Sequence, residues 1–74
     1  MSILTIENLK LAYNYNLQRF NKATRYFENT DPKENEKWLP NYIEIINNMG
    51  ILIDGLKNRG IEVTPEEIES GFNI

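Results

Sequence analysis

Six large apolar residues in the second half of the chain recur at alternating steps of three and four residues. They are Leu39, Tyr42, Ile46, Met49, Ile53 and Leu56. This spacing keeps side chains on one face of an α-helix, where they form a helix-packing seam against a partner helix. Trp38, Ile45 and Leu52 lie beside these positions and make the apolar stripe wider than one partner helix covers. We therefore predict that the rest of the chain packs on a helix built around this seam.

A second stripe of the same kind precedes the seam. From Ile6 to Phe27, apolar residues again recur at steps of three and four, and no glycine or proline interrupts the segment before Pro32. Thr5 is suited to the N-cap position, because its hydroxyl can accept a hydrogen bond from an amide of the first turn. These features predict one long helix over about 5–28.

The segment that contains the seam has clear ends and one internal disturbance. Asp31 followed by Pro32 is typical of a helix start, and Gly60 is typical of a helix end. We predict a second helix over about 32–59. Pro40 lies inside it, lacks an amide proton and has a ring that clashes with the preceding turn. The helix should therefore be bent or broken near Pro40, and the sequence leaves both outcomes open.

Two glycines, Gly50 and Gly55, also lie inside this predicted helix. Glycine weakens a helix interior by about 1 kcal/mol relative to alanine. Close approach of another backbone would explain both glycines, and so would simple tolerance of two weak positions. The sequence favours neither explanation.

The last segment carries signals for a short third helix. Thr64 to Glu67 match a capping box, with proline at the first helical position. We predict a helix over about 65–70. The apolar residues beyond it, Phe72 and Ile74, should fold back onto the two long helices, because this removes their side chains from water.

Together these elements predict an all-α single domain over 1–74, a long antiparallel helical hairpin with a short C-terminal helix. A chain of 74 residues buries only about 60% of the surface that its unfolded form exposes. With neither cysteine nor histidine, it has no disulfide and no Cys/His zinc site to add stability. We therefore expect a homodimer in which two hairpins pack, antiparallel, into a helical bundle.

The composition argues against catalysis, cofactors and metals. Histidine, the commonest general acid–base, is absent, and the glycines do not match the spacing of nucleotide-binding loops. Glu66, Glu67 and Glu69 form the densest acidic cluster, but carboxylates at a helix start are expected for their interaction with the helix dipole. We therefore predict a protein that is not an enzyme and has no cofactor or metal site.

A second face of the first predicted helix suggests a protein interface. Tyr15, Arg19 and Tyr26 lie together about 100° from the apolar stripe, and tyrosine and arginine are frequent anchors in protein interfaces. We predict that these three residues contact an unidentified protein partner. Trp38 and Tyr42 belong either to the same surface or to the core, and we assign them to the core because so short a chain needs large core residues.

Nucleic-acid binding is an alternative. Arg19, Lys22 and Arg25 recur at steps of three and would contact phosphates. The other interpretation of these cations is a solvated face that pairs with the acidic second half. Residues 1–30 carry four basic and two acidic side chains, a net charge of +2, whereas residues 31–74 carry four basic and nine acidic ones, a net charge of −5. The whole chain, at −3, gains no general attraction to DNA or RNA.

The sequence also bears on location. No apolar run approaches the roughly 20 residues that cross a bilayer, and the N-terminal residues do not resemble a signal peptide. The absence of cysteine fits a reducing compartment. We predict a cytoplasmic protein that does not bind membranes.

Three stretches, RFNKATRYFEN at 19–29, EKWLP at 36–40 and TPEEIESGF at 64–72, give the chain a resemblance to short helical proteins encoded by phages, prophages and mobile elements of low-GC Gram-positive bacteria. The resemblance implies no activity and favours a regulator, inhibitor or accessory subunit that acts by binding. We therefore expect a non-enzymatic helical protein-interaction module. A nucleic-acid-binding regulator and a structural subunit of a larger assembly are the alternatives.

Overall fold

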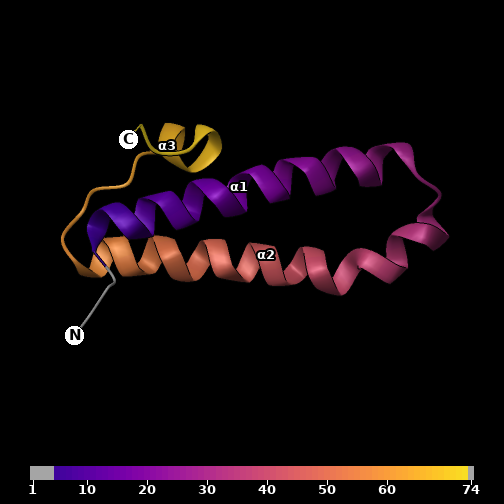
Figure 1. The fold of residues 1–74 in the computed structure, drawn as a ribbon, viewed down its shortest axis with the longest axis horizontal. Helices are drawn as coiled ribbons and strands as arrows, with labels where there is room; N and C mark the ends of the chain where they lie inside the picture. Colours follow the sequence, from indigo (N-terminus) through magenta and orange to yellow (C-terminus); the bar gives the residue numbers. More distant parts are fainter. Residues whose placement is uncertain (1–4, 74) are drawn as a thin grey trace.

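Two long helices, α1 and α2, lie side by side in antiparallel directions, and a short third helix, α3, packs beside α1 (Figure 1). The computed structural model describes residues 5–73. In it α1 spans Ile6–Asn29, α2 spans Pro32–Asn58 and α3 spans Pro65–Ser70. The turn between α1 and α2 forms the closed end of the hairpin, and α3 lies near its open end. The predicted all-α hairpin is confirmed, and each helix end lies within one residue of its predicted position.

The helices begin where capping side chains satisfy free backbone amides. The Thr5 hydroxyl accepts from the amide of Asn8 at 3.1 Å. Thr64 and Glu67 form a complete capping box, because the Glu67 amide donates to the Thr64 hydroxyl at 3.2 Å and the Thr64 amide donates to the Glu67 carboxylate at 3.0 Å. These bonds are local, and residue type alone therefore predicts them.

The second helix is continuous through Pro40. Its first turns are inclined to the rest of the helix in Figure 1, so the structure shows a bend and no break. Pro40 and Glu36, one turn earlier, are both exposed. The carbonyl oxygen that loses its helical partner is therefore on the side of the helix that faces water, which makes a proline tolerable inside it.

The end of α2 is a Schellman motif. Gly60 has a φ of +82°, its amide donates to the Lys57 carbonyl at 3.0 Å, and the amide of Ile61 donates to the Leu56 carbonyl at 3.1 Å. Ile61 packs on the core cluster that contains Leu56, which is the apolar contact that accompanies this motif. Gly60 therefore ends the helix as predicted.

The best-buried part of the core lies toward the open end of the hairpin. Its buried members come from all parts of the chain: Leu9, Tyr13, Leu17, Leu56 and Phe72. Phe72 reaches this cluster from beyond α3, so the prediction that it folds back is confirmed, and Ile74 lies outside the described residues. Burial of these leucine and aromatic side chains is the main apolar contribution to the stability of so short a chain.

The C-terminal segment is fixed to α1 by polar bonds as well. The hydroxyl of Tyr13 donates to the carbonyl of Ile68 at 2.5 Å, and the Asn14 amide group contacts the backbone of Phe72. Gly71, with a φ of +90°, passes so close to Asn14 that an added Cβ would lie 2.7 Å from its Oδ1 atom. Burial raises the pKa of the Tyr13 hydroxyl above its ordinary value.

The face of α2 that packs on α1 differs from the predicted seam. Tyr42, Met49, Ile53 and Leu56 are at least partly buried, as predicted. Leu39 and Ile46, however, are 47% and 43% exposed, and the buried position beside them is Ile45. The prediction was wrong for Leu39 and Ile46 because α1 covers one side of a stripe that is wider than one helix.

Candidate protein-binding groove

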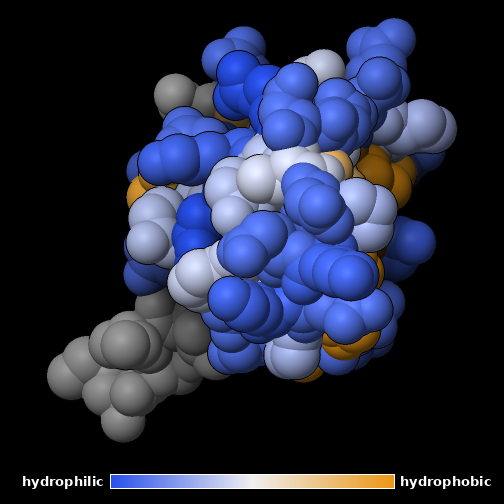
Figure 2. Space-filling view, turned by 90° about the vertical axis from the view of Figure 1, so that its right-hand side faces the viewer, coloured by the Kyte–Doolittle hydropathy of each residue, from blue (hydrophilic) through white to orange (hydrophobic). Residues whose placement is uncertain are grey.

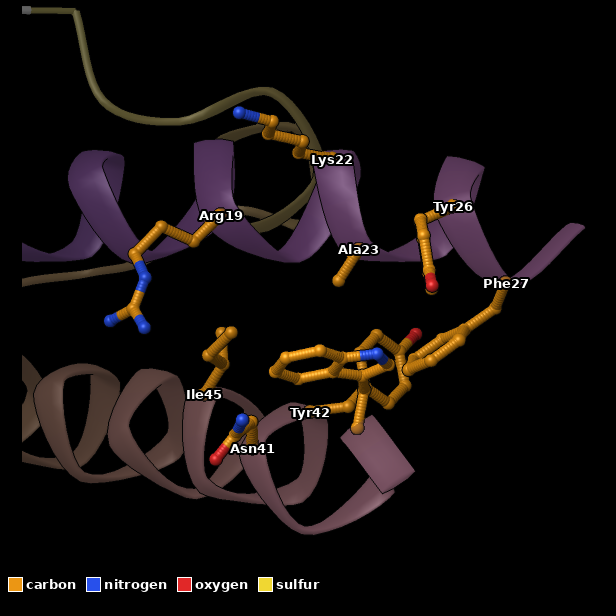
Figure 3. Close-up of a pocket in the computed structure, with 9 residues that line it drawn as sticks. Arg19, Lys22, Ala23, Tyr26, Phe27, Asn41, Tyr42 and Ile45 are labelled. Atoms are coloured by element: carbon orange, nitrogen blue, oxygen red, sulfur yellow. The ribbon is translucent and has the colours of Figure 1, made fainter. Parts of the chain in front are cut away.

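An aromatic groove opens between α1 and α2 near the closed end of the hairpin (Figure 3). Its volume is about 420 Å³. The residues that line it come in two runs, one from each helix: Arg19, Lys22, Ala23, Tyr26 and Phe27 from α1, and Trp38, Asn41, Tyr42 and Ile45 from α2. Aromatic rings with a few polar groups are typical of sites that bind other molecules.

Tyr42 is a rigid wall of this groove. Its ring stacks on Phe20 at a centroid distance of 5.3 Å and meets Phe27 edge-on at 4.9 Å. Its hydroxyl lies 3.0 Å from the hydroxyl of Thr24 on α1. Ring contacts on two sides and a hydrogen bond at the tip hold the side chain in one orientation, so this wall is in place before any ligand binds.

Two other large rings remain partly in water. Trp38 on α2 is 49% exposed and Tyr26 on α1 is 42% exposed. The assignment of Trp38 to the core was therefore wrong, whereas Tyr42 is partly buried as expected. The reason lies across the groove, where α1 presents Ala23, whose short side chain points toward α2 in Figure 3. A methyl group does not fill the space between the helices, and a hollow replaces a packed layer.

The groove has a cationic rim. Arg19 and Lys22 follow one another on α1, and the guanidinium of Arg19 reaches toward α2 beside Ile45, while Lys22 extends the other way (Figure 3). The Arg19 guanidinium also lies 5.8 Å from the centre of the Tyr15 ring. No acidic residue is among those that line the groove. The groove is therefore locally positive although the chain as a whole is acidic.

The structure brings together only part of each predicted site. Of the predicted protein interface, Arg19 and Tyr26 line the groove, while Tyr15 is exposed beside it and contacts Arg19. Of the predicted nucleic-acid contacts, Arg19 and Lys22 line the groove and Arg25 does not. Both predicted sets therefore converge on the same edge of α1.

For α2, a place on this surface was the alternative not chosen for Trp38 and Tyr42, and Asn41 and Ile45 were not predicted at all. Trp38 and Asn41, on either side of Pro40 in α2, line the groove opposite the residues of α1. A small residue such as Ala23 in an apolar stripe, facing a region rich in aromatic residues, is the sequence signal that could have indicated a hollow. That signal becomes specific only when the pairing of the two helices is known.

Within residues 5–73, no three histidine, cysteine, aspartate or glutamate side chains come together in an arrangement that would hold a metal ion. None of the helices in this part of the chain is long and apolar enough to cross a bilayer. Compared with protein-family models, with curated proteins and with solved structures, the chain has no match.

Proposed function

We propose that this chain is a non-enzymatic protein-interaction module that binds a segment of a partner protein in the aromatic groove. The observation that carries the proposal is the pair of half-exposed rings, Trp38 and Tyr26, on either side of a preformed hollow. Tryptophan, tyrosine and arginine are the residue types that most often dominate binding energy at protein interfaces. All three types meet in this groove, with Arg19 at its rim.

The groove favours an acidic amphipathic segment. An apolar side chain of the partner would fill the hollow that Ala23, Trp38 and Tyr42 line. Carboxylates next to that side chain would approach Arg19 and Lys22, and the groove offers no carboxylate to repel them. Charge complementarity of this kind steers association and excludes basic competitors.

A binding role agrees with the resemblance to small proteins of phages and mobile elements. We propose that the chain acts in the cytoplasm as a regulator, inhibitor or accessory subunit, by covering a functional segment of its partner. The absence of cysteine supports this location, because the fold needs no oxidising compartment.

Affinity capture with matched variants tests the proposal. The tagged chain would be compared with Trp38→Ala and Tyr26→Ala, and with Ile51→Ala as the control. Ile51 is a strongly exposed apolar residue outside the groove. We expect the wild type and Ile51→Ala to retain the same partner, and both groove variants to lose it. Equal recovery of that partner by all four proteins would exclude the groove as the binding site.

Binding of single-stranded nucleic acid is a second candidate. Arg19 and Lys22 lie beside exposed rings, and bases stack on such rings while cations contact phosphates. Arg25 lies outside the groove, which leaves two cations there and favours a protein ligand. Fluorescence of Trp38, the one tryptophan of the chain, would decide. Quenching by an oligonucleotide that weakens steeply with added salt would support nucleic acid, and no quenching at low salt would exclude it.

A further inference from the structure

The face of α2 turned away from the groove carries an exposed apolar stripe. At one edge of the stripe, Ile46 also lines a hollow with Leu17 of α1 and Ile68 of α3. Leu39, Ile43 and Ile46 are each more than two-fifths exposed. With 3.6 residues per turn, these three residues and Gly50 lie on one face of the helix. Figure 2, which looks at the closed end of the hairpin, shows hydrophilic residues over the tip and hydrophobic residues mainly at its sides. The molecule measures only 16 Å along its shortest axis, so the two long helices form a single layer.

Gly50 lies at one end of this stripe and has no explanation within a single chain. A Cβ added there would meet nothing within 4 Å, whereas a Cβ at Gly55 would lie 3.7 Å from Leu9 and from Arg59. Glycine weakens a helix interior relative to alanine, and packing inside residues 5–73 gives no reason for it here. A bulky side chain that enters from another molecule would give that reason.

We propose that this stripe binds the same stripe of a second copy of the chain, with the two α2 helices antiparallel. A two-fold axis between Ile46 and Asn47 would bring the two copies of Ile46 together. Ile43 and Gly50 are equally far from that axis, so Ile43 of each copy packs over Gly50 of the other. A two-fold axis generates every such pair twice. The dimer would therefore contain two contacts in which the large side chain of Ile43 packs on the backbone at Gly50.

Charges beyond the two ends of the stripe select the antiparallel orientation. Glu36 and Lys57 are also equally far from the axis, so each Glu36 would face Lys57 of the other copy. Both are exposed, and neither makes an ion pair within residues 5–73. In one chain they are 21 residues apart along α2, or about 31 Å, too far to interact. Parallel helices would instead place like charges opposite each other.

Sedimentation equilibrium with Gly50→Leu tests the contact. The wild type should show a concentration-dependent dimer. Gly50→Leu should remain monomeric with an undiminished helical circular-dichroism signal, because its side chain enters open space in the monomer and the position of Ile43 in the dimer. Ile51→Leu, strongly exposed but off the stripe, should dimerise as the wild type does. A wild type that is monomeric at all concentrations, or a Gly50→Leu variant that dimerises normally, would overturn the proposal.

A charge exchange tests the orientation. Glu36→Lys and Lys57→Glu should each raise the dimer dissociation constant several-fold, since two ion pairs are lost by symmetry. The double variant should return it close to the wild-type value, and the separation within one chain excludes an intramolecular cause for that rescue. A double variant weaker than either single one would refute the antiparallel arrangement. A dimer that survives Gly50→Leu but is lost in Trp38→Ala would place the contact in the groove instead.

Discussion

The side-chain amide of Asn14 satisfies both backbone polar groups of Phe72. Its Nδ2 atom donates to the Phe72 carbonyl at 2.8 Å, and the Phe72 amide donates to its Oδ1 atom at 2.6 Å. One asparagine side chain on α1 thus pairs with the Phe72 backbone as the backbone of a neighbouring strand does in a β-sheet. This pair of bonds fixes the Phe72 ring, which meets Tyr13 edge-on at 5.4 Å, at the open end of the core.

Asn14→Asp should therefore destabilise the fold. A carboxylate accepts from the Phe72 amide but has no proton to donate, so the Phe72 carbonyl would face a negative charge without a donor. We expect the free energy of unfolding in urea to fall by about 1–3 kcal/mol. Gln18→Glu, on an exposed side of the same helix, introduces the same charge and should change it by no more than about 0.5 kcal/mol. Equal effects of the two variants would contradict the assigned bonds.

Tyr13→Phe should change how stability depends on pH. Burial raises the pKa of the Tyr13 hydroxyl above 10.0 in the folded chain. The contribution of this hydroxyl to the free energy of unfolding is therefore complete below the pKa that it has in the unfolded chain. The contribution is lost as the pH rises through the pKa that it has in the folded chain. At neutral pH the free energy of unfolding of Tyr13→Phe should be about 0.5–1.5 kcal/mol lower than that of the wild type, because the hydrogen bond to the Ile68 carbonyl is lost.

Above pH 10, unfolding free energies measured over a pH series should fall more steeply for the wild type than for Tyr13→Phe, because only the wild type must retain a buried ionisable hydroxyl. Tyr15→Phe, an exposed tyrosine on the same helix, is the control and should follow the wild type. Parallel curves for wild type and Tyr13→Phe would contradict the prediction.

Two glycines with positive φ should respond differently to alanine. In Gly60→Ala the added methyl group enters open space. The free energy of unfolding should fall by about 1 kcal/mol, because alanine is strained in the left-handed backbone conformation. Gly71→Ala meets the Oδ1 atom of Asn14 at 2.7 Å as well, so it must also displace the Phe72 bonds and should cost more. Thermal unfolding would rank the two variants, and a Gly71→Ala melting temperature equal to or above that of Gly60→Ala would count against this packing.

Helix ends could be predicted from sequence because their causes are local. The Thr64–Glu67 box and the glycine stop at Gly60 each depend on residues within one turn. The buried face of α2 could not be predicted as reliably. Ile45 and Ile46 both fit a stripe with steps of three and four, and only the position of α1 decides which of them is covered.

The candidate site, too, could be predicted only where its residues lie close together in the sequence. Arg19 and Tyr26 were predicted from their spacing on one helix, and both line the groove. The exposure of Trp38 depends on the residue that the other helix places across the groove, which is the short Ala23. The bonds between Asn14 and Phe72 span 58 residues, a distance at which periodicity carries no information.

The most direct test of the proposed function is fluorine NMR of the chain labelled with fluorotryptophan, titrated with the partner that affinity capture identifies. The chain contains one tryptophan, Trp38, so one resonance reports on the groove regardless of tryptophans in the partner. We predict that this resonance shifts and saturates at the stoichiometry of binding, as the half-exposed ring becomes buried. A partner that binds the chain while the Trp38 resonance stays unchanged would contradict the proposal that the aromatic groove is the binding site.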